Sequence, residues 1–328
     1  MQYRRLGTSG LQLSALSFGA WVTFGQQVGR SQARELLALA HDRGVNFFDN
    51  AETYNNGVAE QVMGDVLADL RFPRDSYCVS SKVFFGAVDD PLPTQRGLSR
   101  KHVMEACHQA LQRLQVDYLD LYFCHRPDPD TPIQETVAAM DTLVRQGKVL
   151  YWGTSEWSAE EIVEAHKVAR ENHMYAPVME QPQYNLLHRE RVEQEYAPLY
   201  DTYGMGTTIW SPLSSGLLSG KYNDGIPKDS RLAQPGYEWL RESVLGKDGE
   251  RVAAVRALQP IADELGGSLA QLAIAWCLHN PHVSTVMLGA SNPQQLADNL
   301  DALDVLPRLD ETMAKRIRAV VEGIPESS

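Results

Sequence analysis

The sequence has little of what marks membrane, secreted or nucleic-acid-binding proteins. No apolar run reaches the ~20 residues that a membrane-spanning helix needs, and the first ten residues, MQYRRLGTSG, lack the apolar core of a signal peptide. Lys and Arg form no basic cluster, and the net charge is −12. We therefore expect a cytoplasmic protein that neither inserts into a membrane nor binds nucleic acid.

Cysteine is also scarce. The chain has four cysteines, widely spaced and without a C-x-x-C pair: Cys78, Cys107, Cys124 and Cys277. This spacing predicts reduced core residues rather than disulfides or metal ligands. No G-x-G-x-x-G follows a strand-like run, which disfavours a Rossmann fold. The run GLLSGK, residues 216–221, resembles a phosphate-binding loop, but its glycines are too close together and Tyr222 replaces the required Ser or Thr.

A strand-like run followed by a helix-like run recurs along the 328 residues. Ser31 and Ser99 are the expected N-caps of two of the helices, and Gly44 is an expected stop. The strand-like runs are short and apolar, which is typical of a parallel sheet covered on both faces. The eight units are ALSFGA with SQARELLALAHDRG, VNFFDNA with AEQVMGDVLADL, SYCVSSKV with SRKHVMEACHQALQRL, YLDLYFCH with PIQETVAAMDTLVRQGK, VLYWGTS with SAEEIVEAHKVARENH, VMEQPQYN with RERVEQEYAPLYDTYG, GTTIWSPL with RVAAVRALQPIADELG and SLAQLAIAWCLHN, and VSTVMLGA with PQQLADNLDAL.

Eight units without a break in composition favour one α/β domain over residues 1–328, a (β/α)8 TIM barrel. The opening YRRLGTSGLQLS predicts an N-terminal β-hairpin whose turn uses Gly7 and Gly10. An extra helix is expected at the C-terminus. The long irregular stretch 214–250 is typical of a functional connection.

Polar residues follow the predicted strands at their carboxyl ends, where such barrels build their active sites. Asp49, Lys82 and His125 end the second, third and fourth strands, and Tyr54 lies in the loop after Asp49. Singly, Asp49 could cap a helix, Lys82 could reach solvent along its stem and His125 could be a hydrogen-bonded rim residue. If the chain forms the predicted barrel, these residues and Tyr54 must all lie at one rim of it, the carboxyl end of the strands. Further strand ends carry Ser155, Gln181 and Ser211.

These four residue types suit proton delivery to a carbonyl oxygen. A tyrosine is a weak acid at neutral pH, and a neighbouring ammonium lowers its pKa. A carboxylate would hold the ammonium, and an imidazole would polarise the carbonyl. A nicotinamide cofactor would then supply a hydride. Lys82 as a Schiff-base nucleophile is the alternative, and it is disfavoured because Asp49 would keep the amine charged.

The run GASNPQQL predicts a helix that begins at Ser291 or Asn292, and a helix N-terminus binds anions. Taken by itself, this run favours simple capping by Ser291 or Asn292 over an anion site. Lys221 and Arg231, in the long connection, are candidate cationic partners. Trp21 and Trp210 are either core residues or walls for a planar ring.

At whole-chain level the sequence resembles the aldo-keto reductases, and within them the branch of the voltage-gated potassium channel β-subunits and their bacterial relatives. The matching runs are GAWVTFG, FFDNAETY, SSKVFFG, LDLYFCHRPDPDTP, GKVLYWGTSEWS, EQPQYN, WSPLSSGLLSGKY, GYEWLRE, LAQLAIAWCLHNPHVSTVMLGASNPQQL and LPRLD.

This resemblance implies a barrel that binds NADP(H) and a catalytic tetrad of Asp49, Tyr54, Lys82 and His125. Tyr54 would be the proton donor, Lys82 with Asp49 would lower its pKa, and His125 would orient the carbonyl. No metal is implied. The cofactor-binding residues implied by the resemblance are Trp21, Gln27, Asp49, Ser155, Gln181, Trp210, Ser211, Pro212, Leu213, Ser215, Gly216, Lys221, Arg231, Gly289, Ser291, Gln295, Asp298 and Asn299.

The sequence departs from that branch at three positions. His125 stands where the channel subunits carry Asn, which favours an enzyme. Ala20 replaces a frequent Thr, and Glu156 replaces a frequent Arg, which removes a positive charge near the nicotinamide end.

The resemblance therefore implies an NADPH-dependent reductase of aldehydes and ketones, a small-molecule carbonyl substrate and a possible homotetramer. The alternative is a redox-sensing regulatory protein, similar to the channel subunits, with slow turnover. Aromatic candidates for the substrate pocket are Trp21, Phe84, Trp157 and Tyr237.

Overall fold

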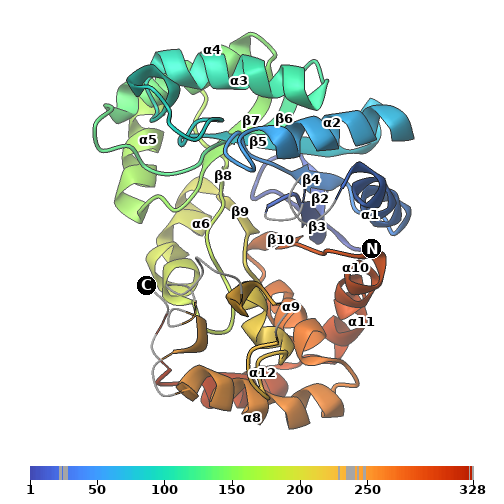
Figure 1. Cartoon of the computed structure of the whole chain (residues 1–328). Coiled ribbons are helices and arrows are strands. Elements are labelled where there is room, and N and C mark those ends of the chain that lie inside the picture. The colour runs from blue at the N-terminus through green and yellow to red at the C-terminus, as the bar shows by residue number, and fades with distance from the viewer. Residues whose placement is uncertain are drawn as a thin grey trace.

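The structure, a computed structural model of the chain, describes residues 1–21, 24, 29–227, 230–233, 241, 244–246, 249–324 and 326. Its centre is a closed barrel of eight parallel strands in the order β10-β3-β4-β5-β6-β7-β8-β9 (Figure 1). The predicted barrel is confirmed. The strands are β3 (Leu16–Gly19), β4 (Phe47–Asp49), β5 (Cys78–Val83), β6 (Leu119–Cys124), β7 (Val149–Thr154), β8 (Met179–Glu180), β9 (Gly206–Ile209) and β10 (Val283–Leu288).

Alternation of side chains along the strands decides what faces the barrel interior. Phe47 of β4 and Phe123 of β6 lie in the apolar cluster inside the barrel, whereas Phe48 packs in the cluster beneath the helices. Two residues beyond each interior phenylalanine come Asp49 and His125. Both therefore point inward, at the carboxyl end of the barrel.

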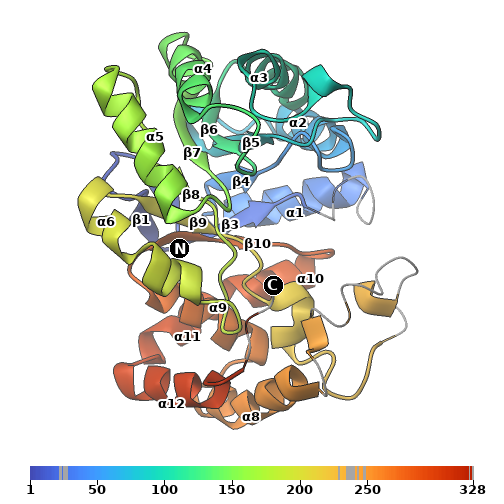
Figure 2. The ribbon, with the colours of Figure 1, turned by 90° about the vertical axis from the view of Figure 1, so that its left-hand side faces the viewer.

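Helices surround the strands on the outside (Figures 1 and 2). The cap predicted at Ser99 is present, because its side chain accepts a hydrogen bond from the His102 backbone N–H. The cap predicted at Ser31 is wrong: the first helix begins at Arg30, after Gly29 in extended conformation. The helices are α1 (Arg30–Asp42), α2 (Val58–Leu70), α3 (Arg100–Leu114), α4 (Ile133–Arg145), α5 (Ala159–Glu171), α6 (Ala197–Tyr203), α8 (Glu250–Glu264), α9 (Leu269–His279), α10 (Pro293–Leu300), α11 (Ala302–Val305) and α12 (Glu311–Val321).

The N-terminal hairpin closes one end of the barrel. Strands β1 (Tyr3–Arg5) and β2 (Gln12–Ser14) are antiparallel, and Leu6 and Leu13 join the interior apolar cluster. Gly7 has the left-handed φ of 56°, and a Cβ there would lie 2.0 Å from the Gly204 carbonyl oxygen. The hairpin thus plugs the amino end of the strands and leaves the carboxyl end for the site.

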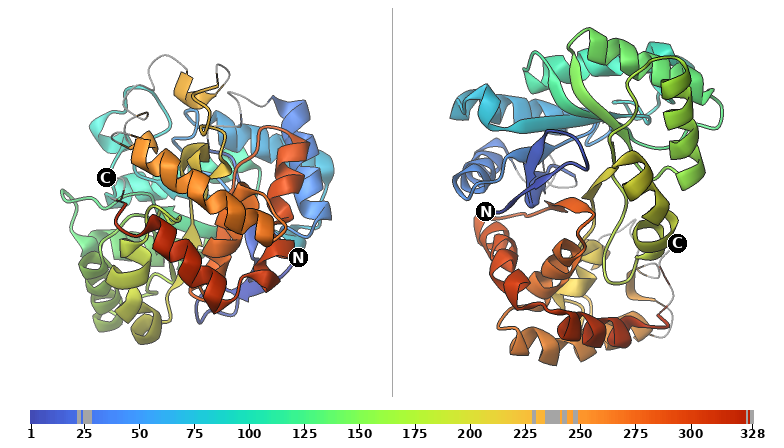
Figure 3. Two further views of the ribbon diagram at one scale, coloured as in Figure 1. Left: turned by 90° about the horizontal axis from the view of Figure 1, so that it is seen from below. Right: turned by 180° about the vertical axis from the view of Figure 1, so that it is seen from behind.

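The expected extra helix is α12, which packs beside α8 on the side of the molecule seen from below in Figure 3. The connection that begins near residue 214 contains the short helical turns Ser214–Ser219 and Arg231–Ala233. Among the described residues, none of the helices is both long enough and apolar enough to cross a membrane.

Candidate active site

Lys82 is the centre of the polar cluster at the barrel mouth. Its side chain is 0% exposed. Its ammonium Nζ lies 2.6 Å from Asp49 Oδ2, 2.8 Å from the Asn50 carbonyl oxygen and 3.0 Å from the Tyr54 hydroxyl. A buried ammonium requires partners of this kind, because an uncompensated charge is costly away from water. Lys82 therefore joins the carboxylate and the phenol in one hydrogen-bonded chain.

Asp49 is oriented from its other side. Ser80 donates to Asp49 Oδ1 at 2.7 Å, and the Gln181 amide lies 3.3 Å from the same oxygen. Ser80, like Lys82 two residues on, projects into the barrel because side chains along β5 alternate. The carboxylate is thus held by donors from β5 and from Gln181, which follows β8.

The electrostatics of Lys82 exclude a neutral amine. Burial would lower the pKa of Lys82, but its contacts with Asp49 and Tyr54 outweigh burial and raise it. A Schiff-base nucleophile needs the opposite, a depressed pKa. Lys82 is an ammonium at neutral pH.

Tyr54 is a protonated phenol. Burial raises the pKa of Tyr54 above its ordinary value, and the positive charge of Lys82 opposes that rise. The predicted lowering by Lys82 is present, but the effect of burial is larger, and the pKa of Tyr54 therefore stays above its ordinary value. A phenol that holds its proton beside an ammonium is prepared to give that proton up once a base arrives.

His125 lies next to Tyr54, with the ring centroids 5.8 Å apart and the rings edge to face. Burial, together with the positive charges of Lys82 and Arg126, lowers the pKa of His125 well below its ordinary value. The imidazole is therefore neutral. Within the described part of the chain, its Nδ1 atom is buried and has no hydrogen-bond partner.

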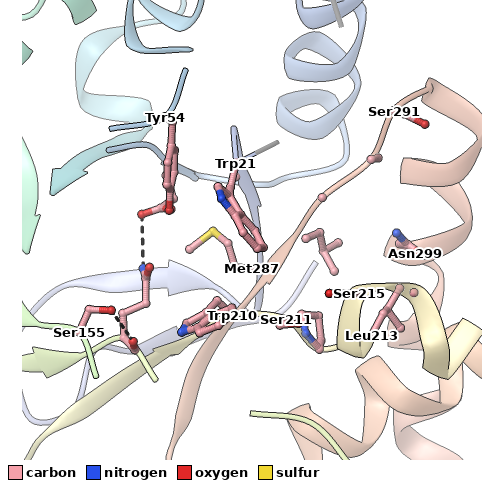
Figure 4. A pocket seen from close by; sticks show the side chains of 18 of the residues that line it. Trp21, Tyr54, Ser155, Trp210, Ser211, Leu213, Ser215, Met287, Ser291 and Asn299 are labelled. Carbon is pink, nitrogen blue, oxygen red and sulfur yellow. Dashed lines mark hydrogen bonds between the residues drawn. The ribbon is translucent and has the colours of Figure 1, made fainter. Parts of the chain in front are cut away.

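These groups open into a cavity of about 790 Å³. Figure 4 shows Tyr54 and Ser155 at one end of it and Ser291 and Asn299 at the other. Polar groups therefore line the cavity at both of these ends. The predicted cofactor residues that line the cavity are Trp21, Asp49, Ser155, Gln181, Trp210, Ser211, Pro212, Leu213, Ser215, Gly216, Lys221, Gly289, Ser291, Gln295 and Asn299.

Three predicted residues are not placed there. Asp298 is exposed outside the cavity, where its carboxylate accepts a hydrogen bond from Gln294 at 2.8 Å. Arg231 lies in the turn Arg231–Ala233, and its side chain is not among the described groups. Gln27 lies outside the described residues.

The far part of the cavity has features that fit an extended dinucleotide. The backbone of Ser211, Ser215 and Gly216 is left-handed, with φ of 57°, 54° and 91°. A Cβ on Gly216 would lie 2.4 Å from Lys221 Nζ, so the Lys221 amine packs directly against this loop. Asn299 Nδ2 is buried and, within the described structure, has no hydrogen-bond partner. A cationic, donor-rich strip of this kind suits phosphates and ribose hydroxyls.

At the end of the same strip, the N-cap of α10 is Asn292, one of the two predicted start residues. The Asn292 side chain caps the helix by accepting from the Gln295 backbone N–H at 2.9 Å. Ser291 stays beside the cap and lines the cavity.

Glu156 has contacts that the sequence did not reveal. It has a left-handed φ of 60°, and its carboxylate accepts from the Gln183 N–H at 2.6 Å and from the Trp210 indole at 2.9 Å. Arg191 donates to the same carboxylate at 2.8 Å. The charge of Arg191 is thus present near the Ser155 end of the cavity and is paired with Glu156. Glu156 also holds the indole of Trp210, which lines the cavity.

Several lining residues were missed in the sequence. Phe85 rather than the expected Phe84 lines the cavity, Trp157 is buried in the core, and Tyr237 lies outside the described residues. Position is the signal that could have found the others, since each lies at the carboxyl end of a strand or within four residues after it. The other missed lining residues are Gly19, Thr53, Arg126, Met287, Leu288 and Ala290.

The model of the Aldo/keto reductase family matches residues 15–322. The chain is 51% identical over 327 residues to a probable voltage-gated potassium channel subunit beta of Oryza sativa subsp. japonica, covering 99% of this chain and 98% of the relative. It is 49% identical over 327 residues, with the same coverage, to a protein of Arabidopsis thaliana that bears the same description. The chain therefore belongs to the aldo/keto reductase family.

Proposed function

We propose that the protein reduces aldehydes and ketones to alcohols, with NADPH as the hydride donor and Tyr54 as the proton donor. The observation that carries this proposal is the Lys82 ammonium, which contacts the Tyr54 hydroxyl and the Asp49 carboxylate at once. This arrangement sits at one end of a cavity of about 790 Å³, and Ser291 and Asn299 lie at its other end.

Each residue of the cluster has a defined task. Tyr54 donates its proton to the carbonyl oxygen, and the Lys82 ammonium stabilises the phenolate that remains. Asp49 keeps Lys82 charged and in place. His125 is neutral, so it can donate one hydrogen bond to the same carbonyl oxygen and hold the substrate.

The cofactor would be held along the strip described above, with Ser155 and Gln181 at its nicotinamide end. Lys221, Ser291 and Asn299 would meet its phosphates and adenosine. When bound, NADPH supplies the hydride that the carbonyl carbon receives. The preference for NADPH over NADH is part of the proposal and rests on the cationic Lys221 at the far part of the strip.

Product analysis tests the proposal. Purified protein is incubated with an aromatic aldehyde and NADPH deuterated at nicotinamide C4, and the alcohol is examined by mass spectrometry. We expect one deuterium on the carbinol carbon and no alcohol from the Tyr54→Phe variant. Alcohol formation that persists in Tyr54→Phe would contradict the assigned proton donor.

A second candidate function follows from the names of the two relatives. The protein would be a cofactor-bound, redox-sensing subunit of a membrane channel, with slow turnover. Affinity purification from native membranes, followed by a turnover assay, separates the two: a stoichiometric channel partner with at most one slow turnover favours the subunit.

We further propose a cytoplasmic protein made of one domain over residues 1–328 and assembled as a homotetramer. Light scattering of the purified protein gives the mass of the assembly, and limited proteolysis shows whether one stable unit spans the chain. A monomer mass would remove the tetramer from the proposal.

A further inference from the structure

A cationic side chain lies beside the reacting groups at the cavity mouth. Arg126 directly follows His125, is half-buried and lines the cavity. Its Nη1 donates to the His125 carbonyl oxygen at 2.5 Å and lies 3.5 Å from Ser155 Oγ. Nη1 thus holds the Arg126 guanidinium in place, and the N–H groups of its other nitrogens remain as donors for a ligand.

The charge of Arg126 is not neutralised by a protein carboxylate in the described part of the chain. Lys82 is paired with Asp49 and Arg191 with Glu156, but none of the described acidic side chains lies within ion-pair distance of Arg126. A half-buried guanidinium that lines a cavity without an anionic partner is suited to an anion brought by a ligand.

Arg126 and His125 flank the same aromatic ring. The Phe85 ring centroid lies 5.8 Å from the Arg126 Cζ atom and 5.2 Å from the His125 ring centroid. Because Arg126 and His125 both contact this ring and both line the cavity, a molecule whose carbonyl meets His125 and Tyr54 has Arg126 near its other end.

Phe85 is exposed yet held in place. Its side chain is 41% exposed, while Glu52 accepts hydrogen bonds from the N–H groups on either side of it, those of Phe84 at 2.8 Å and Gly86 at 2.9 Å. Trp21, also a lining residue, is 47% exposed. Large apolar side chains fixed at a cavity mouth favour a planar, apolar ligand body.

We propose that Arg126 is a specificity-determining residue that selects carbonyl substrates carrying a carboxylate, with an aromatic or other flat apolar body between the two groups. The inference rests on the proposed reductase function and names the class of its substrate. The carboxylate would receive charge-assisted hydrogen bonds from Arg126, and the body of the substrate would contact Phe85 and Trp21.

Matched aldehydes test the proposal. The 3- and 4-carboxybenzaldehydes are compared with the carbamoylbenzaldehydes of the same shape, which lack the charge. The measured quantity is the ratio of kcat/KM values, carboxylate over amide, because changes that affect both substrates equally cancel. Since an amide activates the aldehyde more than a carboxylate does, a preference for the acid must come from the protein.

We expect a ratio of about ten or more for the better isomer in the unaltered protein. Arg126→Gln should lower that ratio by roughly ten- to a hundredfold, the effect of losing hydrogen bonds to a charged group. Arg126→Lys keeps the positive charge but not the planar guanidinium. Its ratio should lie between those of the unaltered protein and Arg126→Gln. Arg170→Gln, which removes an exposed arginine from the last turn of α5, should leave the ratio unchanged.

A ratio at or below one, or one that Arg126→Gln and Arg126→Lys leave unaltered, overturns the proposal while the reductase function stands. If none of the aldehydes is reduced, the reductase function fails, and binding decides the question of Arg126. Benzoate and benzamide are then titrated into the protein with NADPH, and tryptophan fluorescence is followed. Benzoate-selective binding that is lost in Arg126→Gln supports an anion site, and equal binding of the two refutes it.

Discussion

Replacing Lys82 by Met removes the charge at the centre of the site and keeps most of the apolar stem. The Asp49 carboxylate, which is buried, then loses its ion-pair partner and keeps Ser80 and Gln181 as donors. Breaking a buried ion pair by removing one partner costs about 3–5 kcal/mol. We therefore expect Lys82→Met to lower the free energy of unfolding by that amount and to abolish most turnover, because the Tyr54 phenolate loses its ammonium.

A double-mutant cycle separates the cost of the unpaired charge from general disruption. Asp49→Asn alone leaves the Lys82 ammonium without its carboxylate, and should cost about as much as Lys82→Met. If the two costs were independent, the double variant would lose roughly 6–10 kcal/mol. Since the double variant contains neither charge, we expect it to lose no more than either single variant.

Urea unfolding followed by circular dichroism measures all four proteins, with the denaturant dependence compared as a control for altered unfolded states. The activity of the double variant should stay as low as that of Lys82→Met. Removing both charges restores stability, but the ammonium that would stabilise the Tyr54 phenolate is still missing. Additive losses of stability would refute the reasoning that Lys82 and Asp49 act as one pair.

Three further predictions concern Glu180, Glu156 and Lys221. Burial raises the pKa of the Glu180 carboxyl to about 8 against its ordinary value of 4.5, so the folded chain holds a proton that the unfolded chain releases between these values. Stability should therefore fall as the pH rises from about 4.5 to 8, and Glu180→Gln should gain a few kcal/mol relative to the unaltered protein between pH 5 and pH 8, at roughly 1.4 kcal/mol per pH unit, in urea unfolding. Glu156→Ala frees Trp210 and should weaken NADPH binding about tenfold in fluorescence titrations, whereas Glu156→Gln, which keeps an acceptor for the indole, should weaken it less. Lys221→Met should weaken NADPH binding and make it less sensitive to salt, and an unchanged salt dependence would mean that Lys221 does not meet the cofactor's phosphates.

The positions of the reacting groups could be predicted because they follow from the period of a strand. Asp49, Lys82 and His125 each lie at the carboxyl end of a parallel strand. In a closed barrel such positions share one rim, and alternation turns the right ones inward. The roles given to these residues stay predictions. That the residues lie together could be predicted from the fold alone.

The contacts that cross the site could not be predicted in this way. The Glu156 carboxylate accepts a hydrogen bond from Trp210, 54 residues away. This contact depends on a left-handed backbone conformation at Glu156, which could not be predicted from the residue type. Arg126 lies one residue past the end of the alternating pattern, where loop geometry rather than strand period decides direction. Phe84 and Phe85 differ in the same way: which of two adjacent rings enters the cavity depends on how Glu52 holds the loop.

The direction of the Tyr54 pKa was also beyond the sequence. Neighbouring charges can be guessed from motifs, but the extent of burial depends on the packing of the whole rim, and burial is here the largest effect.

The central claim is that the Tyr54–Lys82–Asp49 chain performs carbonyl reduction. It is tested most directly by mixing the protein with NADPH and an excess of a reactive aromatic aldehyde and following the reduced-nicotinamide absorbance, beside Tyr54→Phe. The account predicts many turnovers per protein molecule, a loss of turnover in Tyr54→Phe and NADPH binding of similar strength in both. Tight NADPH binding with at most one slow turnover, or equal rates for the two proteins, would contradict it.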